Sequence, residues 1–228
     1  GNQQEQRWSA PVVDAWHLQS DSVRVPFDVL LPQVGGQWLA RGAELHDANG
    51  LRQRLGGDIA AMDYLQQYLL LSVKGFGLTL LDPSDNLQTA GTIAVAAPLQ
   101  HLAVQGERIL AASGRDLYWF DAVGNQLKAA STQTLGAEVR ALLADGDGFL
   151  ALTSGQLLRL SASGQTQASF TGEGLLSVVR AGDYVQVLDN AGRLWRLDAS
   201  LKGTSTQLGL GAKRLFALPG QVLAVAPQ

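Results

Sequence analysis

A short sequence pattern recurs along this chain of 228 residues. It consists of an apolar run, then an Asp or a Ser, and then a turn of small residues. The marker residues lie 35, 39, 40 and 37 residues apart, at Asp47, Asp82, Asp121, Ser161 and Asp198. A period of this length indicates that one supersecondary unit is copied several times, which constrains the fold more than any other feature of the sequence.

Residues 139–171 show what one unit contains. Four short apolar or alternating segments are separated by turn residues, which is the pattern of an antiparallel four-stranded meander. The turns at 145–148 and 161–164 supply glycines and side-chain oxygens that tight turns use. The same four parts recur over residues 27–57, 59–93, 99–133 and 175–209.

Residues 58–71 allow a second interpretation. Ile59, Met62, Leu65 and Leu69 fall near helical spacing, so periodicity alone is consistent with a helix here. The repeat register instead predicts two strands, because Gln66-Gln67 stands where the other units have a Gly-containing turn. We expect strands.

The ends of the chain contain half a unit each. After residue 209 only two strands are predicted, KRLFALPG and QVLAVAPQ, and the other pair is predicted in PVVDAWHL around Asp14 and in SVRVPF at 22–27. Third strands such as 117–120 are apolar on both faces, which indicates burial on both sides. Small sheets stacked around an axis provide that burial, and the two half units then complete the ring.

The repeated units resemble the blades of β-propellers. The segment GFGLTLLDPSDN at 75–86 is similar to the core of LVIVD-type bacterial propeller repeats. WFDAVGN at 119–125 and WRLDAS at 195–200 resemble the wider WD40-like and PQQ-like class, although the Gly-His and Trp-Asp signatures of WD40 blades are missing. The resemblance implies an all-β fold.

We therefore expect a six-bladed β-propeller of four-stranded antiparallel blades over residues 7–228. Its last blade would be closed by strands from both termini, and residues 1–6 would form a disordered N-terminal segment. A five-bladed ring with an N-terminal arm is the alternative.

Composition excludes several functional classes. A net charge of −3 and a pI near 5.6 argue against a nucleic-acid binder, which carries a clustered basic surface. No apolar stretch approaches the roughly 20 residues of a membrane helix. The absence of cysteine excludes thiol catalysis, disulfides and cysteine-bound zinc.

Residues 1–7 are polar, so we expect an exported protein without its signal, periplasmic or extracellular, with the cytoplasm as the alternative.

No catalytic or metal-binding motif is found. The histidines, His17, His46 and His101, lack the close spacing of a metal pair, and no G-x-S-x-G elbow is present. Asp145-x-Asp147-Gly148 matches the start of a calcium loop but lacks its later ligands. The marker aspartates are expected to bond the backbone of the turns that follow them. We expect no catalytic residue, no metal and no cofactor.

Loops are the expected site of function. In propellers, the turns between second and third strands and the connections between blades meet on one face, and loops on a rigid scaffold commonly carry function. The candidate ligand-binding residues on this face are Arg41, Lys74, Arg115, Asp116, His101, Arg140, Asp189, Arg193 and Lys213. Four of them, Arg41, Lys74, Arg115 and Lys213, could form an electropositive rim that attracts an anion.

The expected function is therefore a non-enzymatic binding scaffold of the bacterial cell envelope, with a protein, a peptide or an anionic small ligand as its partner. A propeller hydrolase or lyase with its site at the central opening is the alternative. A purely structural spacer fits the lack of motifs equally well. Fold analogy supports part of this expectation, because propellers elsewhere host both binding and catalysis.

Overall fold

The structure is a computed structural model that describes residues 16–20, 23–33, 36–208, 211–218 and 221–226. Its described residues are almost entirely β-strands joined by tight turns, with one short 3₁₀ helix, η1 (Pro83–Asp85). None of the described helices is long and apolar enough to cross a membrane. The predicted N-terminal segment 1–6 and Asp14 lie outside the described residues.

Residues 27–144 form one compact unit, the N-terminal unit, which contains three four-stranded antiparallel sheets. In each sheet the strands follow one another in chain order. The first sheet has β3 (Val29–Gln33), β4 (Gly36–Arg41), β5 (Glu44–Asp47) and β6 (Gly50–Arg54). The second has β7 (Ile59–Leu65), β8 (Tyr68–Val73), β9 (Gly77–Asp82) and β10 (Gln88–Ala94). The third has β11 (His101–Gln105), β12 (Arg108–Ser113), β13 (Asp116–Val123) and β14 (Gln126–Thr134).

A second compact unit, the C-terminal unit, comprises residues 145–228 together with residues 1–26. The boundary falls at the last residue of β15 (Val139–Asp145), which begins a sheet with β16 (Gly148–Thr153), β17 (Gln156–Leu160) and β18 (Thr166–Thr171). The next sheet has β19 (Leu175–Ala181), β20 (Tyr184–Asp189), β21 (Arg193–Leu197) and β22 (Gly203–Gln207). Two further strand pairs are β23 (Arg214–Leu218) with β24 (Gln221–Val225), and β1 (Trp16–Ser20) with β2 (Val23–Phe27).

The predicted strands are confirmed in every repeat, including the ambiguous residues 58–71. These residues form β7 and β8, which pair from Ile59 opposite Val73 to Leu65 opposite Tyr68. Gln66 adopts a positive φ of 54° and makes the turn between them, so the chain reverses where a helix would have continued.

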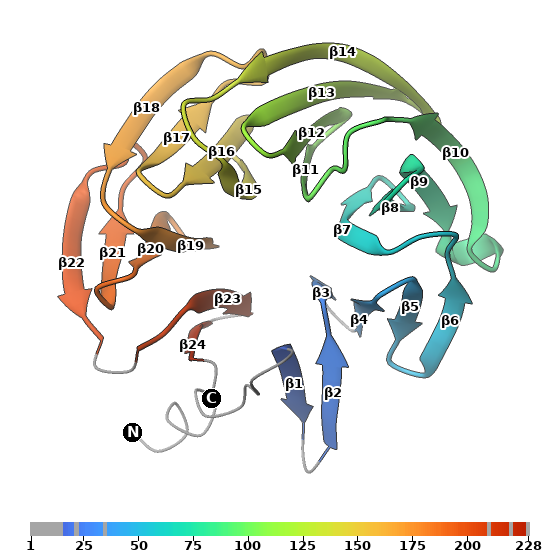
Figure 1. The fold of residues 1–228 in the computed structure, drawn as a ribbon, viewed down its shortest axis with the longest axis horizontal. Coiled ribbons are helices and arrows are strands. Elements are labelled where there is room, and N and C mark those ends of the chain that lie inside the picture. Colours follow the sequence, from blue (N-terminus) through green and yellow to red (C-terminus); the bar gives the residue numbers. More distant parts are fainter. Residues whose placement is uncertain (1–15, 21–22, 34–35, 209–210, 219–220, 227–228) are drawn as a thin grey trace. The chain divides into compact units, whose positions relative to one another are not determined.

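The sheets of the N-terminal unit pack face to face, with their first strands together. β7 contacts both β3 and β11, and Figure 1 shows the fourth strands on the outer side of the sheets. Two apolar cores fill the spaces between the sheets. One contains Trp38, Met62 and Leu71, and the other contains Leu80 and Phe120. Because the middle sheet contributes to both cores, its strands are apolar on both faces, as expected for a propeller blade.

The C-terminal unit repeats this packing. β19 contacts β16 and β23, and a core that includes Val179, Leu188 and Leu215 joins the sheet β19–β22 to the pair β23–β24. Buried polar groups bridge successive sheets as well. The Ser177 hydroxyl accepts a hydrogen bond from the Leu215 amide at 3.0 Å.

The marker residues hold the turns that follow the third strands, as predicted. The carboxylates of Asp47, Asp82 and Asp198 each accept a backbone N–H two residues further on, at 2.8 to 3.0 Å. The Ser161 hydroxyl accepts the Gln165 amide at 3.1 Å. Asp121 differs, because its carboxylate binds the Arg108 guanidinium at 2.7 Å.

The terminal strand pairs do not form one blade in the part of the chain that the structure describes. β1–β2 and β23–β24 are two separate two-stranded sheets. The five complete four-stranded sheets support the β-propeller repeat fold. The joining of both termini in a shared sixth blade stays a prediction.

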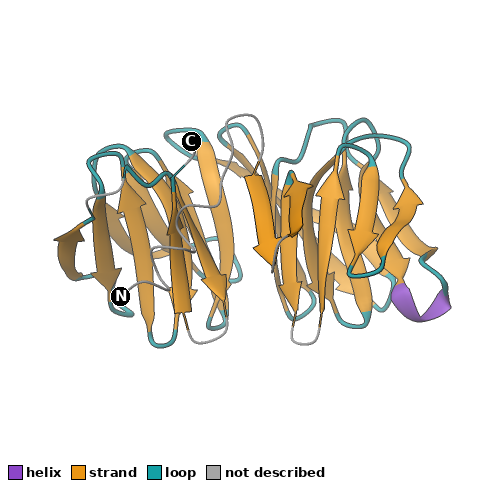
Figure 2. Ribbon diagram, turned by 90° about the horizontal axis from the view of Figure 1, so that it is seen from below, coloured by secondary structure: helices purple, strands orange, loops and turns teal. Residues whose placement is uncertain are grey.

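The antiparallel order divides the turns of each unit between the two ends of its strands. Turns between first and second strands, and between third and fourth strands, lie at one end of the strands, and we call this surface the opposite edge. Turns between second and third strands lie at the other end of the strands together with the connections between sheets, and we call that surface the connection edge. Figure 2 shows strands running between two edges that carry the turns, with the 3₁₀ helix, part of the β9–β10 turn, at the opposite edge.

Candidate functional site

The connection edge of the N-terminal unit is built by backbone hydrogen bonds that repeat from sheet to sheet. The connection 55–58 is held against the β4–β5 turn, because Leu55 N–H donates to Ala43 at 2.7 Å and Ile59 N–H donates to Gly42 at 2.9 Å. The connection 135–138 is held against the β12–β13 turn in the same way, by bonds from Leu135 and Val139 to Arg115 and Gly114, both at 2.8 Å.

Side chains just before the first strands fix the same turns. The Asp28 carboxylate accepts the Gly42 amide at 2.7 Å, and the Gln100 side-chain oxygen accepts the Gly114 amide at 3.2 Å. Both glycines have a φ of +57°, a conformation that other residues adopt only with strain. The edge is therefore a row of firmly held turns and connections.

An exposed aromatic ring lies on this edge. Phe76, in the β8–β9 turn, is 60% exposed. Its ring lies against Gly56 of the connection 55–58, so closely that a Cβ added to Gly56 would come within 2.9 Å of the ring. On the other side, Gly77 approaches Val95, where the connection 95–100 begins, and Ala96 and Pro98 of that connection are exposed. Phe76 thus lies against the connection 55–58, next to the residue that approaches the connection 95–100, and is open to solvent.

Three predicted cations lie on successive turns of this edge. Arg41, Lys74 and Arg115 are exposed, and the structure gives their side chains no hydrogen bond, ion pair or ring contact with any described residue. We call Phe76, Ala96 and Pro98, together with Lys74 and Arg115, the Phe76 patch.

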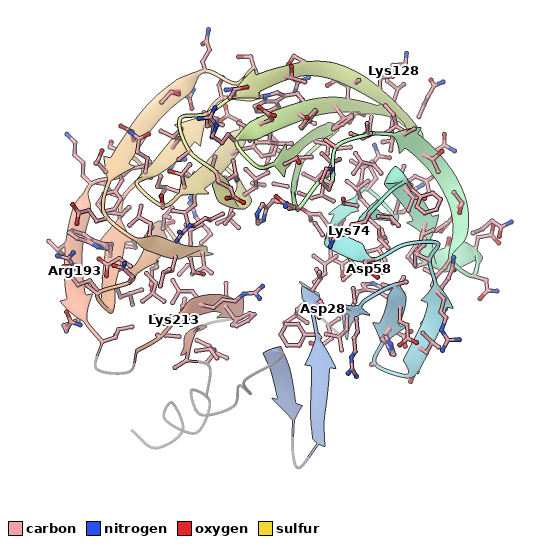
Figure 3. The ribbon with its side chains drawn as sticks, viewed as in Figure 1. Asp28, Asp58, Lys74, Lys128, Arg193 and Lys213 are labelled. Carbon is pink, nitrogen blue, oxygen red and sulfur yellow. The ribbon has the colours of Figure 1, made fainter. Side chains whose placement is uncertain are left out.

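Acidic side chains share the edge with these cations. Asp58 ends the connection that follows the first sheet on the connection edge, after the turn with Arg41. Its backbone carbonyl accepts a hydrogen bond from the Lys74 amide at 2.9 Å. Figure 3 labels Asp28, Asp58 and Lys74, which come from the first two sheets of the unit and lie near one another. Glu138 is exposed beyond Arg115. The edge of this unit therefore carries charges of both signs rather than an uninterrupted positive rim.

The other predicted residues of the N-terminal unit have different surroundings. Asp116 accepts a hydrogen bond from the Thr134 hydroxyl at 2.7 Å. His101 begins β11 and is half-buried, and Arg140 is exposed on β15. They belong to the same edge by their place in the repeat.

The predicted residues of the C-terminal unit include a buried carboxylate. Asp189 is 1% exposed and accepts hydrogen bonds from the amides of Ala191 and Arg193, the Arg193 guanidinium and the Trp195 indole. Burial alone would raise the pKa of Asp189, but the hydrogen bonds from Arg193 and Trp195 outweigh it and hold the pKa below its ordinary value. Asp189 and Arg193 thus organise the β20–β21 turn. Lys213 is exposed just before β23.

Two other carboxylates, one buried and one partly buried, connect successive sheets. Asp145 forms ion pairs with Arg159 of its own sheet and with Arg180 of the next sheet. Asp145 is the first residue of the segment that matches the start of a calcium loop, and it therefore has a structural role. Asp63 on β7 accepts the Val104 amide of β11 at 3.1 Å. Among the described residues, no three His, Asp or Glu side chains gather so that they could hold a metal ion.

A second exposed apolar side chain lies on the opposite edge of the N-terminal unit. Val123, in the β13–β14 turn, is 60% exposed. It borders an open pocket of about 610 Å³ between β10 and the start of β14, where the Asn125 amide donates to the Ala90 carbonyl at 2.8 Å. This pocket is lined largely by small and polar residues.

Comparisons with known proteins identify the fold but no family. No family model and no curated protein matches the sequence. Among solved structures, BBS1N in complex with ARL6DN is similar with a TM-score of 0.71 and 16% identity, over 88% of this chain and 74% of that chain. The computationally designed Ika8 protein matches with a TM-score of 0.67 and 11% identity, over 90% and 69%.

A chain of the Mitotic Checkpoint Complex also matches, with a TM-score of 0.66 and 13% identity, over 83% of this chain and 68% of that one. At these identities the likeness concerns the fold alone. Together with the four-stranded antiparallel sheets, it shows that the chain is a β-propeller repeat protein.

Phe76 was not among the residues predicted from the sequence, although a signal for it is present. The β8–β9 turn reads Lys-Gly-Phe-Gly, where the corresponding turns read Arg-Gly-Ala-Glu and Ser-Gly-Arg-Asp. An aromatic residue in a tight turn, where the other repeats have small or charged residues, has no core to enter. Such a residue is a candidate for recognition.

Proposed function

We propose that this protein is a non-enzymatic β-propeller scaffold that binds another protein through the connection edge of its N-terminal unit. The observation that carries this proposal is the 60% exposure of Phe76, whose ring lies against the firmly held connection 55–58. Aromatic side chains are enriched at the energetic centres of protein interfaces, and the Phe76 ring is open to a partner.

The solved structures with the same fold support the proposal. One of them is a complex of BBS1N with ARL6DN, and another is a chain of the Mitotic Checkpoint Complex. These propellers take part in protein assemblies. The analogy concerns architecture, so the choice of edge rests on Phe76 and its neighbours.

The test compares two equally exposed apolar residues on opposite edges of the same unit. Phe76→Ser and Val123→Ser each remove a side chain that is 60% exposed, so neither should lower the melting temperature appreciably. Proteins captured from an extract of the native cells are quantified by mass spectrometry for both variants and the wild type. Titration calorimetry with each purified partner follows.

We expect a partner that binds the wild type and Val123→Ser alike and is lost with Phe76→Ser. A partner that depends on Val123 and ignores Phe76 would move the binding site to the pocket between β10 and β14. If the wild type, Phe76→Ser and Val123→Ser all capture the same proteins, neither residue takes part in binding, and the proposal is wrong.

The cellular location is a separate proposal. We propose that the protein works in the bacterial cell envelope, because a chain without cysteine tolerates an oxidising compartment. Fractionation of the native cells tests this, since recovery with the cytoplasm would contradict it. An anionic small ligand has less support than a protein partner, because Asp58 and Glu138 stand among the cations of the edge.

A further inference from the structure

The connection beside Phe76 differs from the other two in its unit. Connections 55–58 and 135–138 read Leu-Gly-Gly-Asp and Leu-Gly-Ala-Glu, so each ends in an exposed acid. The connection 95–100 reads Val-Ala-Ala-Pro-Leu-Gln and carries no charge. The part of the connection edge between Phe76 and the next turn is therefore uncharged and, apart from Gln100, apolar.

Cations flank this apolar stretch at both ends. Lys74 is two residues before Phe76, and Arg115 lies in the turn that the Gln100 side chain helps to hold. Both side chains are exposed and make no interaction with a described residue, so both are available to a partner. Asp58 is an exposed acid beside the Lys74 turn, at the end of the connection 55–58 whose Gly56 lies against the Phe76 ring.

We infer that the Phe76 patch binds a segment of the partner in which an apolar side chain is flanked by Asp or Glu. The inference rests on the proposed function and specifies the partner's chemistry. The apolar side chain would cover the Phe76 ring, and the carboxylates would pair with Lys74 and Arg115. Charge pairs at the rim of an interface select the partner and its orientation, while the buried aromatic contact supplies most of the affinity.

The size of the patch favours a short segment over a folded surface. It consists of two turns and one connection at one end of two adjacent sheets. An extended peptide or a loop can place one side chain on Phe76 and its neighbours on either side, because successive residues of an extended chain are about 3.4 Å apart.

The experiment is a selection of random phage-displayed peptides on the whole purified chain, followed by fluorescence polarisation with synthetic versions of the enriched peptides. We expect enriched peptides to contain Phe, Leu, Ile or Trp within about four residues of two or more acids. Phe76→Ser should weaken their binding at least about thirtyfold.

Charge reversal provides the specific test. Lys74→Glu with Arg115→Glu should weaken binding about tenfold, and replacing the peptide's acids by lysine should restore it. Lys128→Glu is the matched control, because Lys128 is an exposed cation on the outer strand β14, away from the patch (Figure 3). It should leave the affinity unchanged.

Two outcomes would overturn the inference. Enriched peptides that are basic or uncharged, but still require Phe76, would leave the proposed function intact and remove the acidic partner. A selection without enrichment, or with peptides that bind Phe76→Ser as well as the wild type, would also reject this partner class. The proposed function would then be decided by the capture experiment alone.

Discussion

Asp63 shows how one residue can make the stability of this protein depend on pH. Its carboxyl group is largely buried on β7 and accepts two backbone amides, Tyr64 at 2.7 Å and Val104 at 3.1 Å. Burial raises its pKa from 3.8 to about 6, because the two hydrogen bonds do not compensate for the lost hydration. Burial also raises the pKa of Tyr64, to about 12, which lies outside the relevant range.

The folded state therefore holds the proton of Asp63 more tightly than the unfolded state does. Between about pH 4 and pH 6 the native chain binds more protons at this site, so its free energy of unfolding falls as the pH rises, by about 3 kcal/mol in total. We predict that Asp63→Asn removes this decline. Urea denaturation of both proteins from pH 4 to pH 7 measures the difference.

The control is Glu107→Gln, which neutralises an exposed acid in the β11–β12 turn of the same unit. It should follow the wild-type profile. If the difference in stability between wild type and Asp63→Asn stays constant over this pH range, the carboxyl group of Asp63 is not buried as the structure has it.

At the scale of the element, polar groups join one blade to the next. Asp145 has a side chain that is 1% exposed, and it lies between Arg159 of β17 and Arg180 of β19. Arg159 is also largely buried, whereas the Arg180 side chain is 41% exposed. Removing one partner of a buried ion pair leaves a charge without compensation, which costs more than the pair contributes.

We predict that Asp145→Asn lowers the free energy of unfolding by about 3 kcal/mol and that Arg180→Ala lowers it by less than about 1 kcal/mol. The double variant Asp145→Leu with Arg159→Met should recover much of the loss, because an apolar pair carries no buried charge. Urea unfolding measures all three. Equal losses for Asp145→Asn and Arg180→Ala would contradict this account.

The elements could be predicted from the sequence because the repeat supplied several copies of the same evidence. Residues 58–71 have helical spacing, yet the turn expected at Gln66 from the other repeats predicted strands correctly. The bonds between blades could not be predicted in this way. Asp63 meets Val104 and Asp145 meets Arg180 across one repeat, and only folding brings such distant residues together.

The candidate site was predicted in part, for a related reason. Lys74 and Arg115 were found because their place in the repeat puts them on turns. Asp189 also lies at the end of a strand, but its carboxylate binds the hydrogen-bond donors of the β20–β21 turn and is buried there. Phe76 is an exception to the repeat, and reasoning from shared features does not find the position at which one copy differs.

At the scale of the whole molecule, the repeat pattern accounts for five complete blades and leaves the two ends to be explained. Asp28 precedes β3 as Asp58 precedes β7, so the strands before Asp28 hold the sequence position of third and fourth strands. β23 and β24 hold the positions of a first and a second strand. By sequence position the two pairs would be the complementary halves of one blade, whereas the described residues form them as separate sheets.

We predict that deleting residues 1–22 exposes the free edge of β24. In a shared blade, the amides of β24 that do not bond β23 would bond an N-terminal strand and would be protected from hydrogen exchange. The deletion should then raise the exchange rate over 221–225 about tenfold or more, while 149–153 of β16 serves as the internal reference. In a five-bladed ring with an N-terminal arm, β24 already has an open edge. Its exchange rate would be the same with and without residues 1–22, and that result would decide for the alternative.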